Sequence, residues 1–183
     1  MLAFMLSACW YSDAELDAAL DAADTGTGSD ADTSELVAGC PDEPEGGAPD
    51  FTLVDKSGDP WSLHELCDSV VLLVFDAYWN GAGPGTADEV QDWYESYGEQ
   101  GLFPIEVVGE NAAGESPTAE DLATLQSEWG ISYLVLADPG FETYWEFNEE
   151  SSGVLPYMVL LGRGLVIVDG DGAVNEAQLA REL

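Results

Sequence analysis

The chain has 183 residues, of which 46% are hydrophobic, and it includes enough aromatic residues to build a folded core. Its 37 acidic residues face only three basic ones, which gives a formal net charge of −34. This balance excludes nucleic-acid binding and electrostatic attachment to anionic lipid, because both require basic side chains.

The first nine residues, MLAFMLSAC, end in an aliphatic residue, two small residues and a cysteine. This tetrapeptide, Leu6 to Cys9, resembles the cleavage site (lipobox) of bacterial lipoprotein signal peptides, in which the cysteine becomes lipidated. The resemblance implies a lipid anchor on Cys9 and an exported protein of the bacterial cell envelope. Such a protein would lie on the periplasmic side of the outer membrane or at the cell surface. The apolar run is short and has no basic segment before it, so the alternative is an unstructured N-terminus with a chance match.

Residues 10–47 consist mostly of Asp, Ala, Thr, Gly, Ser and Glu, a composition typical of a flexible tether. We therefore divide the chain into a signal remnant over 1–9, an acidic tether over 10–47 and one folded domain over 48–183. No other stretch approaches the ~18 apolar residues that a membrane span needs.

In the folded part, short apolar runs alternate with segments of helical periodicity. Strands are expected over 51–54, 61–63, 70–75, 103–108, 133–136, 157–161 and 165–168, and helical segments over 64–67, 86–97, 118–129, 141–147 and 175–183. Thr86 is the predicted N-cap of its helix, and Thr118 with Asp121 forms the predicted capping box of the next. This order predicts an α/β fold with an N-terminal β-hairpin and a central mixed, mostly parallel sheet that has helices on both faces.

Three motifs occur in order along the folded part: APDFTL at 48–53, VVLLVFDAYW at 70–79 and VLP at 154–156. Together they resemble the thioredoxin-like superfamily, and within it the redoxin group of AhpC/TSA proteins and membrane-tethered thiol oxidoreductases. The resemblance implies a thioredoxin-like fold over about residues 48–183. It also implies that Pro156 follows a cis peptide bond and faces the active site of the family.

The loop after Trp79 departs from the pattern of this family, which places C-x-x-C there. Asn80 stands at the position of the nucleophilic cysteine, and Gly83 stands at the position of the resolving cysteine. The chemistry of the family needs a thiolate that attacks a disulfide or a peroxide, and neither an amide nor a glycine can supply one. We therefore expect no standard catalytic residues in this loop.

Two cysteines remain if Cys9 bears lipid. In an exported protein, Cys40 and Cys67 are expected to form a structural disulfide, and the alternative is a relocated redox pair. His64 is the only histidine, so we interpret it as a surface residue and expect neither a metal site nor a cofactor. Residues 169–172, DGDG, lack the remaining ligands of a calcium loop and are expected to form a turn.

The resemblance also implies a peptide-binding groove, lined by Tyr78, Trp79, Asn80 and Pro156. Backbone pairing with an extended peptide needs no cysteine, so binding can persist after catalysis is lost. The predicted function is a non-catalytic binding or scaffold module with an unidentified protein or peptide partner. One alternative is a thiol–disulfide oxidoreductase or peroxidase-like antioxidant protein that uses Cys40 and Cys67. Another is that Tyr78 and Trp79 serve packing alone.

Overall fold

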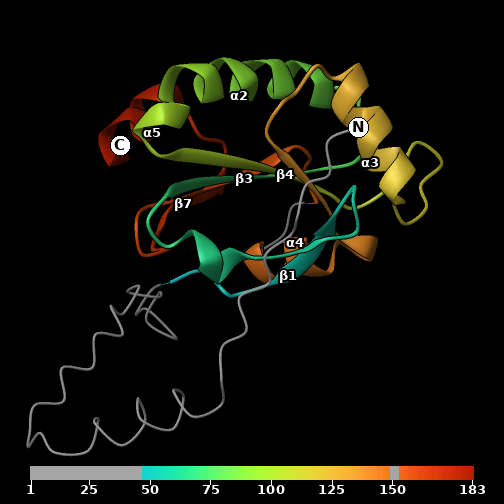
Figure 1. Cartoon of the computed structure of the whole chain (residues 1–183), viewed down its shortest axis with the longest axis horizontal. Coiled ribbons are helices and arrows are strands. Elements are labelled where there is room, and N and C mark those ends of the chain that lie inside the picture. Colours follow the sequence, from blue (N-terminus) through green and yellow to red (C-terminus); the bar gives the residue numbers. More distant parts are fainter. Residues whose placement is uncertain (1–46, 149–152) are drawn as a thin grey trace, which may run out of the picture. The chain divides into compact units, whose positions relative to one another are not determined.

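The computed structural model describes residues 47–148 and 153–183, so Cys9, Cys40 and nearly all of the predicted tether lie outside the described residues. Seven strands form one mixed sheet in the order β2-β1-β5-β4-β3-β6-β7 (Figure 1). The strands are β1 (Thr52–Asp55), β2 (Pro60–Ser62), β3 (Val70–Asp76), β4 (Leu102–Val108), β5 (Leu134–Ala137), β6 (Tyr157–Leu161) and β7 (Ile167–Gly172). The helices are α2 (Gly83–Tyr97), α3 (Ala119–Glu128), α4 (Glu142–Phe147) and α5 (Glu176–Glu182), with short 3-10 helices η1 (Leu63–Leu66), η2 (Gly98–Gln100) and η3 (Pro139–Phe141).

The central strands β3, β4 and β5 run parallel, so their carboxyl ends meet at one edge of the sheet. Strand β6 lies antiparallel to β3 and therefore begins at that same edge. The pairs β1–β2, β1–β5 and β6–β7 are also antiparallel. The sheet is mixed as predicted, but it is not mostly parallel: only the pairs β3–β4 and β4–β5 are parallel, because the flanking strands on both sides return in the opposite direction. In α/β sheets, ligands bind beyond the carboxyl ends of the parallel strands, so this edge is where a site is expected.

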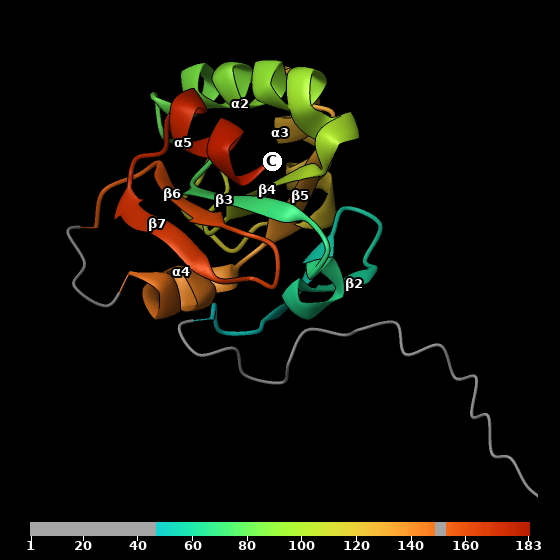
Figure 2. The same cartoon turned by 90° about the vertical axis from the view of Figure 1, so that its left-hand side faces the viewer.

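Helices cover the sheet on both sides (Figure 2). Helices α2, α3 and α5 pack on one face, and α4 and η1 pack on the other. All seven residues of β3 are buried, and alternate residues point to opposite faces. Val70, Leu72 and Val74 contribute to the core under α2, whereas Val71, Leu73 and Phe75 contribute to the core over α4. The apolar run of the sequence thus forms the central strand of the domain.

The capping box predicted for α3 is confirmed. Thr118 Oγ1 accepts a hydrogen bond from the Asp121 backbone N–H at 3.2 Å, and Asp121 Oδ2 accepts one from the Thr118 backbone N–H at 2.8 Å. The N-cap predicted at Thr86 is wrong, because α2 begins at Gly83 and the Thr86 N–H already donates to the Ala82 carbonyl. Pro84 lies in the first turn, where its missing N–H costs nothing. Gly83 is therefore part of the helix and not of an exposed loop.

Residues 169–172 form the end of β7, so the turn predicted there is also wrong. The carboxylate of Asp169 is engaged within the protein, because it accepts hydrogen bonds from the Asp171 N–H and the Gln178 side chain. Within the described residues, no group of three His, Cys, Asp or Glu side chains could hold a metal ion. In the same part of the chain, every helix is too short or too polar to cross a membrane.

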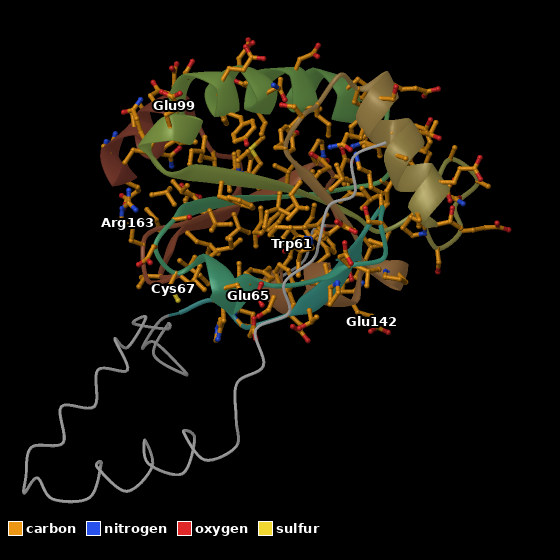
Figure 3. All side chains as sticks on the ribbon, viewed as in Figure 1. Trp61, Glu65, Cys67, Glu99, Glu142 and Arg163 are labelled. Atoms are coloured by element: carbon orange, nitrogen blue, oxygen red, sulfur yellow. The ribbon has the colours of Figure 1, made fainter. Side chains whose placement is uncertain are left out.

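Most acidic side chains of the described residues have no basic partner. Glu65, Glu99 and Glu142 project outward from three different elements (Figure 3). Among residues 47–148 and 153–183, the one contact within ion-pair distance joins Asp50 Oδ2 and His64 Nδ1, which lie 3.9 Å apart and form an ion pair when His64 is protonated. The His64 side chain is 24% exposed, so it is partly buried and not the surface residue that was predicted.

Two of the three basic side chains donate to neutral acceptors and not to carboxylates. Lys56 donates to the Gln126 side chain, and Arg163 donates to the carbonyl groups of Asp68 and Gln100. The negative charges therefore repel one another with little local compensation, and this repulsion acts against the folded state.

This repulsion predicts that salt stabilises the fold. Raising NaCl from about 0.05 M to about 1 M shortens the Debye length to roughly 3 Å and screens the surface carboxylates. We expect a rise of roughly 5 °C in Tm, measured by circular dichroism, which corresponds to about 2 kcal/mol for a chain of this length. An osmolarity-matched sucrose series is the control. A Tm that rises no more with NaCl than with sucrose would contradict this prediction.

Candidate functional site

The loop that follows β3 is held by a buried carboxylate. Asp76, the last residue of β3, is fully buried, and its Oδ1 accepts hydrogen bonds from the Ala77 N–H at 2.8 Å and from Asn80 Nδ2 at 2.6 Å. Asn80 Oδ1 in turn accepts a hydrogen bond from the Ala82 N–H at 3.2 Å. Both polar atoms of the Asn80 side chain thus form hydrogen bonds within the loop. We call this arrangement the Asp76–Asn80 clasp.

Gly83 is buried against the second oxygen of the same carboxylate. A Cβ atom at Gly83 would lie 2.5 Å from Asp76 Oδ2 and 2.5 Å from Trp129 Cη2, and both contacts are too short for any real side chain. The position that the resemblance assigns to a resolving cysteine is thus filled by the side chains of Asp76 and Trp129. No sequence pattern signalled this contact, because Trp129 lies at the end of α3, far along the chain.

A second buried acid lies beside Asp76. Glu106 lies opposite Val74 in the β3–β4 register, which places it on the same face as Asp76, and its Oε2 accepts a hydrogen bond from the Tyr133 hydroxyl at 3.1 Å. Burial raises the pKa of Asp76 to about 6, although its hydrogen bonds from Asn80 and Ala77 act in the opposite direction. Burial, and next the charge of Asp76, raises the pKa of Glu106 well above its usual range.

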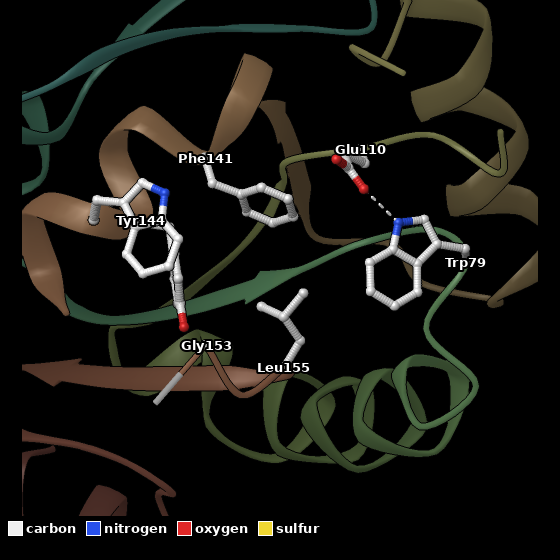
Figure 4. Close-up of a pocket in the computed structure, with 7 residues that line it drawn as sticks. Trp79, Glu110, Phe141, Tyr144, Gly153 and Leu155 are labelled. Atoms are coloured by element: carbon white, nitrogen blue, oxygen red, sulfur yellow. Dashed lines mark hydrogen bonds between the residues drawn. The ribbon is translucent and has the colours of Figure 1, made fainter. Parts of the chain in front are cut away.

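A pocket opens on the other face of the sheet, at the carboxyl ends of β3 and β4 (Figure 4). Its volume is about 210 Å³, and its lining is largely aromatic: Trp79, Glu110, Phe141, Tyr144, Trp145, Gly153 and Leu155. Trp79 Nε1 donates a hydrogen bond to Glu110 Oε2 at 2.7 Å, which fixes the indole ring at one end of the pocket. Glu110 is held beside the loop because its carbonyl accepts a hydrogen bond from the Tyr78 N–H at 2.9 Å.

Helix α4, which supplies the aromatic wall, is positioned by Asp138. This buried carboxylate accepts hydrogen bonds from the N–H groups of Thr143 and Tyr144, at 2.9 and 3.0 Å, and so satisfies the first turn of the helix. The Tyr144 hydroxyl accepts a hydrogen bond from Asn148 and donates one to the Val154 carbonyl at 3.3 Å. These bonds link the aromatic wall to the segment that contains Leu155.

The predicted groove residues separate in the structure. Trp79 lines the pocket, and Pro156 follows the lining residue Leu155 through a cis peptide bond. Tyr78 points to the opposite face, where its ring packs edge-on against Trp129 and its hydroxyl donates to Glu128 Oε2 at 2.5 Å. Asn80 belongs to the clasp. Sequence reasoning missed the remaining lining residues because they come from segments far apart in the chain.

Cys67 lies between η1 and β3, near the start of β3, and is disulfide-bonded. The carboxyl end of β3, where the pocket opens, is roughly 20 Å away at about 3.3 Å per strand residue. Cys9 and Cys40 lie outside the described residues, so the pairing of Cys40 with Cys67 and the lipidation of Cys9 stay predictions.

The element order, the mixed sheet with helices on both faces and the site at the carboxyl edge define a thioredoxin-like α/β domain. Residues 45–177 match the model of the AhpC/TSA family, and the chain belongs to that family. Peroxiredoxin Q, chloroplastic, from Arabidopsis thaliana is 30% identical over 133 residues, which cover 70% of this chain and 55% of that protein. The chain thus spans about half the length of this curated relative.

Solved structures support the same fold. A thiol:disulfide interchange protein, thioredoxin family protein from Chlorobium tepidum TLS, superposes with a TM-score of 0.60 and 17% identity over 77% of this chain and 95% of its own. Peroxidoxin BcpB from Mycobacterium tuberculosis superposes with a TM-score of 0.55 and 18% identity over 67% of this chain and 80% of its own. At these identities the likeness concerns the fold alone.

The contact at Gly83 predicts that even a methyl group is not tolerated there. We expect Gly83→Ala to lower the free energy of unfolding by about 1–3 kcal/mol, because the new Cβ forces Asp76 or Trp129 to move. Gly85→Ala, in the same helix with open space around it, is the matched control and should stabilise by up to about 1 kcal/mol. Urea unfolding measures both. Equal stability of the two variants would show that Gly83 is not packed as described.

The raised pKa of Asp76 predicts a pH-dependent stability. The folded state holds the proton of Asp76 up to about pH 6, whereas the unfolded state loses it near pH 3.8. The stabilisation from this group is therefore complete below pH 3.8 and is lost as the pH rises through about 6, by roughly 3 kcal/mol.

Asp76→Asn removes this titration while keeping an oxygen for the hydrogen bonds from Ala77 and Asn80. Relative to the wild type, its free energy of unfolding should therefore increase between about pH 4 and pH 8, by up to roughly 3 kcal/mol. Urea unfolding at fixed ionic strength measures the difference, and Asp92→Asn, at an exposed carboxylate on α2, is the surface control. If the difference in free energy of unfolding between Asp76→Asn and the wild type does not change with pH, the raised pKa of Asp76 is contradicted.

Proposed function

We propose that this chain is a non-catalytic AhpC/TSA-family domain that binds an extended polypeptide in the pocket beside Trp79. The observation that carries the proposal is the contrast between the two faces of one loop. On one face, Asn80 and Gly83 supply no thiol: Asn80 is hydrogen-bonded to Asp76, and Gly83 is closed in by Asp76 and Trp129. On the other face, the aromatic pocket is open to solvent, with Trp79 53% and Trp145 47% exposed.

The loss of thiol chemistry is supported by the clasp. A nucleophilic cysteine needs a thiolate at the start of α2, and in this chain that position is an amide hydrogen-bonded to Asp76. The neighbouring carboxyl group of Asp76 is ionised above about pH 6, and its negative charge would disfavour a thiolate further. The loop is therefore organised around a carboxylate in place of a reacting sulfur.

Polypeptide binding is supported by the pocket and by the backbone beside it. Exposed tryptophans that flank an apolar hollow are typical of the anchoring points of protein interfaces. Within the described residues, neither the N–H nor the carbonyl of Leu155 forms a backbone hydrogen bond. An extended chain could pair with these groups while placing one side chain in the pocket.

We further propose that the domain is tethered at the bacterial cell envelope through lipid on Cys9. The Leu6–Cys9 tetrapeptide supports the lipid attachment, and the acidic composition of residues 10–47 supports a tether. Such a tether would hold the binding pocket away from the membrane surface, where it could meet an exported partner.

The second candidate is a thiol–disulfide oxidoreductase or peroxidase-like protein that uses Cys40 and Cys67. The disulfide-bonded state of Cys67 favours it, as do the activities named for the relatives. Against it, Cys67 lies at the opposite end of β3 from the pocket. A substrate gripped at Trp79 would therefore not reach this sulfur.

The proposed function predicts binding without turnover. An array of short Gly/Ser/Thr peptides, with the central residue varied, should retain the wild-type chain, and Trp79→Ala should lower the affinity at least about tenfold. Tyr78→Phe is the matched control, because the ring of Tyr78 packs against Trp129 on the other side of the sheet. This variant should bind the peptides as the wild type does.

Insulin reduction and peroxide consumption are measured in parallel and should stay at the level of buffer. Turnover that Cys67→Ser abolishes would favour the oxidoreductase. Absence of any Trp79-dependent peptide binding would contradict the binding function itself.

A further inference from the structure

We propose that the pocket selects a cationic side chain, arginine or lysine, of the bound polypeptide. This inference rests on the proposed function, because it names the residue that a polypeptide partner would place in the pocket. It follows from three features of the pocket: its aromatic walls, the one carboxylate among its described lining residues and the charge of the surrounding surface.

The aromatic walls suit a cation because ring faces carry negative potential. Tyr144 meets Trp145 edge-on, with ring centroids 4.7 Å apart, and meets Phe141 edge-on at 5.8 Å. These rings are set at angles to one another and do not form a flat stack. Trp79 closes another side of the pocket, and Figure 4 shows it facing Phe141 and Leu155 across the hollow.

Glu110 supplies the charge that a cation requires. Its Oε2 already accepts the indole N–H of Trp79, and this bond makes the indole ring more electron-rich. In the described part of the chain, no donor reaches Glu110 Oε1, and Glu110 is only half-buried. This oxygen is therefore available to an ammonium or guanidinium group, which would gain a charge-assisted hydrogen bond.

The surroundings disfavour acidic and aliphatic side chains. No basic residue lines the pocket, and the chain has a net charge of −34, so an acidic side chain would be repelled and a cation attracted. A purely aliphatic side chain would fill the volume of about 210 Å³ but would leave Glu110 partly desolvated without a partner. Arginine and lysine have apolar stems that match Leu155 and Phe141, and charged ends that match Glu110.

The test uses peptides that differ at one position, acetyl-Gly-Ser-Thr-X-Thr-Ser-Gly-amide, with X as arginine, lysine, citrulline, norleucine or glutamate. Citrulline has the shape of arginine without its charge. Isothermal titration with the full chain should give affinities at least about tenfold higher for arginine and lysine than for citrulline and norleucine, and no binding of the glutamate peptide.

Glu110→Gln keeps an oxygen for the Trp79 indole and removes the charge, so it should reduce the arginine-to-citrulline preference to less than about threefold. Glu99→Gln, an exposed carboxylate on η2, makes the same change in net charge away from the pocket and should keep the preference. A reduced preference in both variants would indicate a general charge effect and overturn the proposal.

The remaining outcomes separate this inference from the proposed function. Equal binding of the norleucine and arginine peptides would overturn the selection of a cation and leave polypeptide binding intact. Failure of every peptide to bind would overturn both. If tetramethylammonium binds as tightly as the arginine peptide and its binding depends on Trp79, the occupant of the pocket is a small organic cation. That result would overturn the proposal that the cation belongs to a polypeptide.

Discussion

The carboxyl group of Asp76 is the constraint on which the rest of the site depends. One oxygen holds the loop after β3 through Ala77 and Asn80, and the other fills the space against Gly83. The loop and the start of α2 thus keep a defined shape with no sulfur in it. The stability of this arrangement depends on pH, because burial raises the pKa of Asp76 to about 6 and raises that of the neighbouring Glu106 well above its usual range.

One face of the loop is buried and the other is open to solvent, because adjacent residues point in opposite directions. Tyr78 joins the core under α2, where it packs on Trp129, while Trp79 reaches the pocket beside α4. Closing the first face with Asp76 and Trp129 therefore leaves the second face open. On the proposed function, a family member can lose the reacting cysteines and still keep a binding surface, because the loop and the pocket lie on separate sides of one sheet.

The sequence predicted the fold well where local patterns decide it. The apolar run of β3 and the Thr118–Asp121 capping box were both found where expected. It failed where tertiary contacts decide: α2 begins at Gly83 because the helix packs there against Asp76, and residues 169–172 extend because they pair with β6.

The pocket was only partly predictable for the same reason. Trp79 and Pro156 carried a family motif, but Glu110 and the pair Phe141 and Tyr144 come from two other segments that only the sheet topology brings together. The buried Glu106 had one signal, a lone charge within an apolar strand run, but nothing in the sequence placed it beside Asp76.

The most direct test of the account is a nitrogen-15 NMR titration that follows the tryptophan indole N–H signals while the arginine peptide is added. The account predicts saturable shifts of the Trp79 and Trp145 signals, which belong to the pocket, and little change for the buried Trp93 and Trp129. Shifts confined to Trp93 and Trp129, or no saturable shift of any indole signal, would contradict a recognition site beside the closed loop.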